Sequence, residues 1–150
     1  MAMCDITFRQ ANGADIKQLL RIETAVFTSP WSEDAFRSEF YTNAYAYYIV
    51  AEKAGEVIGY AGVWMILDEG HITNIAIYPD EQGHGYGKAM MQELLRLAEE
   101  KAVRRLTLEV RVTNDRAQQM YKKFGFKDGA IRKKYYPDNG EDALVMWVEL

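Results

Sequence analysis

The sequence predicts an α/β fold with a mixed β-sheet. Two β-rich runs, residues 45–52 and 57–67, are joined by "KAGE", a short segment typical of a tight hairpin. Further along, β-rich runs alternate with runs whose apolar residues recur at helical spacing, as in β-α-β units. A hairpin followed by such units favours a sheet that contains both antiparallel and parallel pairs.

The chain has the length of one ordinary domain. Its 150 residues can bury a sizeable core, and no repeat, low-complexity segment or Pro/Gly/Ser-rich linker interrupts them. Hydrophobic residues make up 49% and charged residues 27%, a composition typical of globular rather than disordered proteins. We therefore expect a single domain over residues 1–150.

Charge and cysteine content narrow the class of protein. A net charge of −4 argues against nucleic-acid binding, which usually requires a basic face. No apolar run reaches the roughly 20 residues of a membrane span, and no signal peptide opens the chain. The one cysteine, Cys4, cannot form an internal disulfide, which favours a reducing compartment. We expect a cytoplasmic protein with neither nucleic-acid nor membrane partners.

The first elements follow from apolar spacing and capping residues. Residues 6–11 ("ITFRQA") are predicted to form a strand. Asp15 precedes a helical stripe of apolar residues, which comprises Ile16, Leu19, Leu20 and Ile22. In "SPWSEDAFRSEF", Ser32 is suited to cap the N-terminus of a short second helix.

The second half of the chain alternates strands and helices. A strand at 71–79 ends at Pro79, and apolar residues at helical spacing then predict a helix from Gly87 to about Ala102. The remaining predicted elements are a strand at 105–110, a helix at 114–124, and two strands near 126–134 and 142–149.

Three glycines, Gly83, Gly85 and Gly87, lie between the 71–79 strand and the helix that follows. A loop that opens a helix presents free N–H groups and the positive end of the helix dipole, which together attract anions. Glycines let an anion approach those groups without meeting a Cβ atom. The stretch is therefore either a flexible glycine turn or a phosphate-binding loop.

Two common phosphate-binding patterns do not fit this loop. The dinucleotide fingerprint requires a glycine where Lys88 stands. The P-loop requires a glycine where Gln82 stands, and Ser or Thr where Ala89 stands. The pattern that remains is Gln82-x-x-Gly85-x-Gly87.

That pattern resembles the pyrophosphate loop of the GNAT superfamily of N-acetyltransferases, in which Gln or Arg and two glycines hold coenzyme A. The stretch "LTLEVRVTNDRAQQMYKKFGF" resembles the second half of the same fold. "SPWS" and "RKKYYPDNGEDALVM" resemble one branch, the ribosomal-protein-alanine N-acetyltransferases. The resemblance covers nearly the whole chain and implies a central mixed sheet flanked by about four helices, with acetyl-CoA as co-substrate and no metal.

The resemblance also implies which residues bind the cofactor. The glycine loop would hold the diphosphate, the strand before it would offer backbone groups to the pantetheine arm and the thioester, and Asn114 would touch the cofactor while it caps its helix. The implied positions are Ile75, Ala76, Ile77, Gln82, Gly83, His84, Gly85, Tyr86, Gly87, Lys88 and Asn114. Gln82 stands where Arg is also common in the family, which removes one positive charge.

Glu109 is the candidate general base. Acetyl transfer needs a neutral amine, and an α-amine with a pKa near ~7.7–8.0 requires only a modest base, whereas a lysine near ~10.4 requires more. Alternation in "RLTLEVRV" places Thr107, Glu109 and Arg111 on one face of their strand. The residues of this strand alone leave open that Glu109 faces solvent or pairs with a cation. The resemblance implies that Glu109 accepts the proton of the amine.

Tyr121 is the candidate general acid. It lies on the apolar side of the 114–124 helix, which by itself favours a packing role. The resemblance implies that this tyrosine donates a proton to the leaving thiolate. A phenol with a pKa near ~10 can protonate a thiolate whose conjugate thiol has a pKa near ~8.5 only if its surroundings help.

The acceptor side is less clear from the sequence. Trp31, Tyr135 and Tyr136 are candidates to line a peptide groove, with Glu141 or Asp142 meeting a basic peptide, but aromatic packing and a solvated turn explain them equally well. His71 and His84 have no partners at metal-ligand spacing, so we expect no metal. No serine or cysteine is paired with a base, which favours direct transfer over an acyl-enzyme.

Three functions remain open. The first is acetylation of a protein N-terminus, most naturally the N-terminal alanine of a ribosomal protein. The second is acetylation of a small amine or of another N-terminus by an enzyme of the same superfamily. The third is a coenzyme A-binding module without turnover, although Glu109 and Tyr121 together speak against it. We expect a monomer or a weak homodimer.

Overall fold

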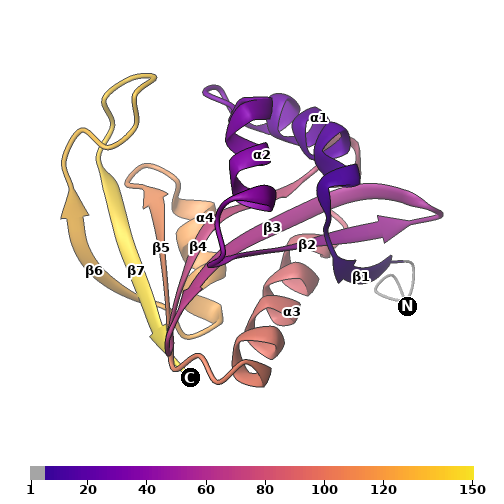
Figure 1. The fold of residues 1–150 in the computed structure, drawn as a ribbon. Coiled ribbons are helices and arrows are strands. Elements are labelled where there is room, and N and C mark those ends of the chain that lie inside the picture. Colours follow the sequence, from indigo (N-terminus) through magenta and orange to yellow (C-terminus); the bar gives the residue numbers. More distant parts are fainter. Residues whose placement is uncertain (1–5) are drawn as a thin grey trace.

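A computed structural model of the chain describes residues 6–150 (Figure 1). Cys4 lies outside the described residues. The strands are β1 Ile6–Gln10, β2 Ala46–Lys53, β3 Glu56–Ile66, β4 Glu69–Ile77, β5 Arg105–Arg111, β6 Lys127–Arg132 and β7 Ala143–Glu149. The α-helices are α1 Ile16–Val26, α2 Glu33–Tyr41, α3 Tyr86–Glu100 and α4 Asp115–Lys123. Two short 3₁₀ turns lie at Gly13–Asp15 and Pro79–Glu81.

The strands form one seven-stranded sheet in the order β1-β2-β3-β4-β5-β7-β6. Strands β4 and β5 pair in parallel, and every other neighbouring pair is antiparallel. The predicted mixed sheet is therefore confirmed. The sequence did not predict that β7 inserts between β5 and β6, because that order depends on contacts between segments far apart in the chain.

Helices cover both faces of the sheet (Figure 1). Alternate residues of β2 belong to different parts of the core: Tyr48 and Val50 pack with α1 and α2, whereas Ile49 and Ala51 pack with α3 and α4. In Figure 1, α1 and α2 lie together on one side of β2 and β3, and α3 lies on the other. None of the helices within residues 6–150 is both long enough and apolar enough to span a bilayer.

Strands β4 and β5 separate after a short paired segment. Their parallel pairing covers only Glu69–His71 against Arg105–Thr107. Beyond His71 and Thr107 the two strands diverge, and residues 75–77 of β4 pair only with β3 in the described part of the sheet. The divergence opens a gap in the middle of the sheet, where backbone groups of β4 have no strand partner on the β5 side.

The predicted turn and caps are confirmed. Ala54 and Gly55 form the two-residue β2–β3 turn, both with positive φ, as hairpin turns of this length require. Ser32 caps α2 and Asn114 caps α4, each accepting a backbone N–H from the first helical turn. Helix α3 begins at Tyr86, one residue before the predicted start.

Candidate active site

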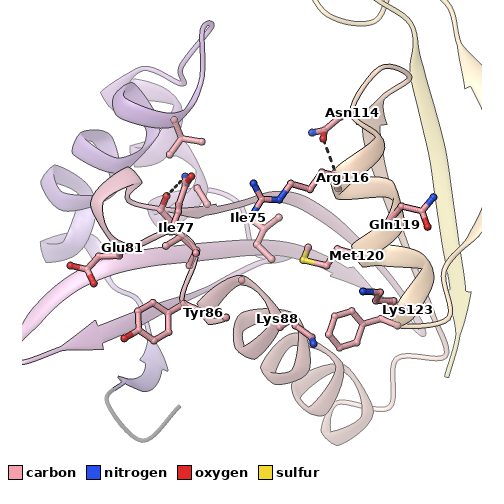
Figure 2. Close-up of a pocket in the computed structure, with 18 residues that line it drawn as sticks. Ile75, Ile77, Glu81, Tyr86, Lys88, Asn114, Arg116, Gln119, Met120 and Lys123 are labelled. Atoms are coloured by element: carbon pink, nitrogen blue, oxygen red, sulfur yellow. Dashed lines mark hydrogen bonds between the residues drawn. The ribbon is translucent and has the colours of Figure 1, made fainter. Parts of the chain in front are cut away.

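A cleft of about 630 Å³ lies between the end of β4, the start of α3 and the length of α4 (Figure 2). This volume falls within the range of about 300–1,000 Å³ that is usual for small-molecule and cofactor sites. Ten of the eleven predicted cofactor residues line it: Ile75, Ala76, Ile77, Gln82, Gly83, Gly85, Tyr86, Gly87, Lys88 and Asn114. The eleventh, His84, is exposed beside it with its ring 5.7 Å from that of Tyr86.

The three glycines differ in backbone conformation and surroundings. Gly83 and Gly85 have φ of +84° and +83°, in the left-handed region that side chains disfavour. Gly87 has no such φ, and a Cβ atom there would meet nothing nearer than Met120 Sδ at 4.0 Å. Neither backbone strain nor packing within the chain explains Gly87, so the open space beside it is free for a ligand that approaches the backbone.

The N-terminus of α3 is uncapped. Its first backbone bond runs from the Ala89 N–H to the Gly85 carbonyl, so the N–H groups of Tyr86, Gly87 and Lys88 have no acceptor within the helix. Gly85 supplies no side chain to satisfy them. These donors and the positive end of the helix dipole are therefore available to an anion in the cleft.

Side chains brace the glycine loop from both sides. The Gln82 amide donates a hydrogen bond of 3.0 Å to the Ile77 carbonyl, which ties the loop to the end of β4. Lys53 of β2 pairs with Glu81 at 2.9 Å and approaches the ring of buried Tyr86. The loop is held by its neighbours while its backbone donors stay open.

Three cations give the cleft a positive lining although the chain as a whole is acidic. Lys88, Arg116 and Lys123 line it, and none of them is ion-paired with a carboxylate of residues 6–150. Figure 2 shows Arg116 extending from α4 toward Ile75 of β4. Glu81, the one acidic residue of the lining, is neutralised by Lys53. The cleft is thus suited to a polyanionic ligand.

Glu109 lies on the opposite face of the sheet. Its neighbours Leu108 and Val110 are buried in the core with α3 and α4, so alternation directs Glu109 away from those helices, as predicted. It lies on β5 just beyond Thr107, the last residue paired with β4. Glu109 is therefore at the edge of the gap through which the cleft on one face can meet a molecule on the other.

The Glu109 carboxylate is well surrounded. Oε1 lies 3.0 Å from His71 Nε2 and accepts a hydrogen bond of 3.2 Å from the Tyr135 hydroxyl, and Oε2 lies 3.6 Å from Arg132. Burial raises the pKa of Glu109, but the hydrogen bond and charge of His71, the Tyr135 hydroxyl and the charge of Arg132 together hold it below its ordinary 4.5. Glu109 is thus ionised at neutral pH.

Two loops border the Glu109 face. The α1–α2 connection and the β6–β7 connection are joined by a hydrogen bond of 2.5 Å from Thr28 to Asp138. Arg111 of β5 binds Asp138 at 2.8 Å and Glu141 at 3.2 Å, and so fixes the second loop to the sheet. These contacts hold the two loops together beside the face of β5 that carries Glu109 and Arg111.

The predicted acceptor residues divide between this face and the framework. Tyr135 contacts Glu109. The Tyr136 ring packs edge-on against the Tyr135 ring and lies 4.0 Å from the Arg111 guanidinium. Trp31 is partly buried against Phe36. The carboxylate of Glu141 is engaged by Arg111 and Thr113, and that of Asp142 by Lys133 and the Lys134 N–H.

Tyr121 is buried in the face of α4 that packs on the sheet. It is 7% exposed, contacts the Phe126 ring and is absent from the cleft lining. Burial alone raises the pKa of Tyr121 to about 12. The Tyr121 hydroxyl has no hydrogen-bond partner among residues 6–150.

The sequence missed several residues of this site. His71 was considered only as a metal ligand, and the structure places it against Glu109; no cluster of metal-ligating side chains occurs in the part of the chain described. Arg132 beside Glu109, and Arg116 and Lys123 in the cleft, were also missed. The spacing of Arg116 and Lys123 after Asn114 puts both on α4, but only the fold brings that helix to the glycine loop.

A seven-stranded mixed sheet that splits between β4 and β5, with a positively lined cleft beside the split, is the arrangement of an acyltransferase. The acetyltransferase (GNAT) family matches residues 16–126, and the chain belongs to this family. Members of the family use acetyl-CoA. The predicted fold and enzyme class are therefore confirmed.

The chain is similar to known proteins over nearly the whole length of both chains. A Bacillus subtilis protein named "Putative ribosomal protein bS18-alanine N-acetyltransferase" is 51% identical, over 91% of this chain and 90% of its own. The ribosomal protein bS18-alanine N-acetyltransferase of Escherichia coli K12 is 34% identical, over 93% and 95% of the two chains. The crystal structure of the E. coli ribosomal-protein-S18-alanine N-acetyltransferase matches with a TM-score of 0.90 at 32% identity, covering 96% of this chain and 93% of that one.

Proposed function

We propose that this protein transfers the acetyl group of acetyl-CoA to the N-terminal α-amine of a protein, and that its acceptor is the N-terminal alanine of a ribosomal protein. The names of its relatives in B. subtilis and E. coli support this acceptor. A ribosomal acceptor agrees with a cytoplasmic protein. The observation that carries the proposal is the placement of Glu109 at the gap between β4 and β5, opposite a positively lined cleft.

The residues of the cleft fit coenzyme A. The uncapped N–H groups of Tyr86, Gly87 and Lys88 suit its diphosphate, and Arg116 and Lys123 suit its remaining negative charge. The backbone groups of β4 at residues 75–77 that face away from β3, and so have no strand partner, suit the amide-bearing arm and the thioester carbonyl. When bound, acetyl-CoA supplies the acetyl group as a reactive thioester.

Glu109 acts as the general base in this proposal. An α-amine with a pKa near ~7.7–8.0 is about one-tenth neutral at pH 7, so a single ionised carboxylate, directly or through one water, can remove the remaining proton. Oε1 already accepts bonds from His71 and Tyr135. Oε2 is the oxygen left to face the amine, with Arg132 at 3.6 Å to balance its charge between turnovers.

Tyr121 assists the leaving sulfur in this proposal. Its pKa of about 12 keeps it protonated throughout the working range. A thiol has a pKa near ~8.5, so full transfer of the phenol proton would be uphill by about 3.5 units, or roughly 5 kcal/mol. The contribution that fits these values is a hydrogen bond donated as charge develops on the sulfur, with solvent completing the protonation.

The test is thiol release from acetyl-CoA with a panel of acceptors. Peptides that begin with alanine and carry ribosomal-protein N-terminal sequences should be acetylated, and mass spectrometry should place the acetyl group on the α-amine. Activity on polyamines but on no peptide would replace this proposal with a small-amine acetyltransferase. Coenzyme A binding without thiol release for any acceptor would indicate a binding module.

A further inference from the structure

His71 is in direct contact with Glu109 although it comes from another strand. It lies on β4 opposite Thr107 of β5, at the last paired position before the strands diverge. Its imidazole bridges two β5 side chains: Nδ1 lies 2.9 Å from Thr107 Oγ1, and Nε2 lies 3.0 Å from Glu109 Oε1. The ring therefore spans the bottom of the gap.

The contacts define which nitrogen carries a proton. A carboxylate oxygen only accepts, so the nitrogen that faces Glu109, Nε2, must donate. In the neutral ring Nδ1 then accepts, and the Thr107 hydroxyl is its donor. Thr107, His71 and Glu109 thus form one directed chain of hydrogen bonds, whose last member is the carboxylate at the gap.

We infer that His71 is a positioning residue that fixes the rotamer of Glu109 by occupying Oε1 and so leaves Oε2 for the acceptor amine. This inference rests on the proposed role of Glu109 as base. The Glu109 side chain is 10% exposed and that of His71 is 32% exposed, so the ring contacts solvent while the carboxylate is largely shielded from it. Thr107 and His71 line a separate groove of about 290 Å³ that ends at the β3–β4 turn.

The groups that face Glu109 set the effect of removing His71. They are His71 from β4, Arg132 from β6, and Tyr135 and Tyr136 from the loop after β6; Arg111, on the same face of β5, is already paired with Asp138 and Glu141. Burial opposes ionisation of Glu109, and His71 is the largest opposing contribution. Loss of His71 therefore moves the pKa of Glu109 upward.

The experiment compares His71→Leu with His71→Gln, whose amide can still donate to Glu109. In His71→Leu, kcat should fall by about 10- to 100-fold, the range expected for a misplaced catalytic group, with the KM for acetyl-CoA unchanged. His71→Gln should recover most of the loss. The acid limb of kcat/KM should move to higher pH in His71→Leu, because loss of His71 raises the pKa of Glu109.

Two further variants keep the outcomes distinct. Arg105 lies on the same face of β5 as Glu109, forms a surface ion pair with Glu149 and does not contact Glu109. Arg105→Leu is therefore the matched control for stability. Glu109→Gln reports on the proposed base itself. Native activity in Glu109→Gln would overturn the base assignment, whereas an impaired Glu109→Gln with native kcat in His71→Leu would overturn only the inference about His71.

The double variant completes the test. If His71 acts through Glu109, His71→Leu should add nothing to the loss already caused by Glu109→Gln. If the fold-loss in the double variant equals the product of the losses in the two single variants, His71 acts independently of Glu109 and the inference is overturned. If the melting temperature of His71→Leu is well below that of Arg105→Leu, the kcat of His71→Gln is the deciding measurement. A native-like kcat in His71→Gln supports the inference, and a loss equal to that of His71→Leu overturns it.

Discussion

The two faces of the split sheet are built by different means. On the α3/α4 face the cleft is formed largely by backbone: positive-φ glycines, an uncapped helix start and an unpaired strand edge. On the other face the site is formed by side chains from β4, β5, β6 and the loop after β6, which converge on Glu109. Backbone geometry suits a ligand that never changes, whereas side chains suit an acceptor that must be selected and deprotonated.

If this division is correct, substitutions around Glu109 and substitutions in the cleft lining should affect different constants. Tyr121, which lies on the α4 face outside that lining, is proposed to assist the leaving sulfur and is not part of the division. Substitutions around Glu109 should lower kcat or alter its pH dependence and leave coenzyme A affinity unchanged. Substitutions in the cleft should weaken coenzyme A binding and leave the pH profile unchanged. A residue whose substitution changes both constants would contradict the division.

The largest effect is expected for Glu109→Gln. At pH 7 the loss of the base should lower kcat by about 10²- to 10⁴-fold. The deficit should shrink as pH rises through the pKa of the α-amine, near ~7.7–8.0, because the amine then needs no base. Steady-state thiol release between about pH 6 and pH 9.5, roughly 1.5 to 2 units either side of that pKa, measures this.

The control is coenzyme A affinity measured by calorimetry on the same variant. Glu109 faces away from α3 and α4, and the glutamine amide keeps the shape of the side chain and can still accept a bond from His71. Affinity should therefore be native. A constant deficit at all pH values would mean that Glu109 positions the acceptor rather than deprotonating it.

Tyr121→Phe should give the next largest effect. Loss of the hydrogen bond to the sulfur should lower kcat by about 10²-fold. Because the pKa of Tyr121 is about 12, the hydroxyl is protonated across the whole working range and the deficit should not vary with pH. The hydroxyl has no partner within residues 6–150, so the melting temperature should hardly change. A native kcat would assign Tyr121 to packing alone.

The sequence predicted the fold and the residues that line the cleft far better than the contacts around Glu109. The loop at Gly83, Gly85 and Gly87 is local, so its glycines and the following helix are visible within a short stretch of chain. The contact between His71 and Glu109 joins residues that are 38 positions apart (109 − 71) on neighbouring strands. Nothing in either stretch specifies that pairing, because it depends on the parallel register of β4 and β5.

The predicted acceptor residues illustrate the same limit. Glu141 is acidic and close to the aromatic pair in sequence, and these features suggested contact with a basic peptide. In the structure its carboxylate binds Arg111 and Thr113, and these bonds lower the pKa of Glu141. Composition shows which residues are charged, but only the fold shows which charges are already paired.

On the cofactor face, Gly87→Ala should separate binding from folding. Alanine is more favourable than glycine in a helix by up to about 1 kcal/mol, so the variant should melt no lower than the native protein. The added methyl group enters the open space beside the backbone of α3, where the nearest atom of residues 6–150 is Met120 Sδ at 4.0 Å. Coenzyme A should bind about tenfold more weakly, a loss of about 1.4 kcal/mol.

That result would be measured by calorimetry together with thermal unfolding. The peptide KM and the pH profile of kcat at saturating acetyl-CoA should stay native, since Gly87 lies on the α3 side of the sheet. Unchanged affinity in a folded Gly87→Ala variant would show that no ligand approaches this position and would contradict the assignment of the loop.

The smallest effect is expected from single cations of the cleft, and Lys123→Ala has a matched control one residue away. Lys123 lines the cleft, whereas Lys122 lies outside it and approaches Asp128 at 3.8 Å. An exposed charge pair contributes about 0.2–1 kcal/mol, so Lys123→Ala should weaken coenzyme A binding by at most about fivefold, and less as salt rises. Lys122→Ala should have no effect on affinity. Equal losses in both variants would mean that the cleft attracts its ligand through the overall charge of α4, and that the individual positions of the cations do not matter.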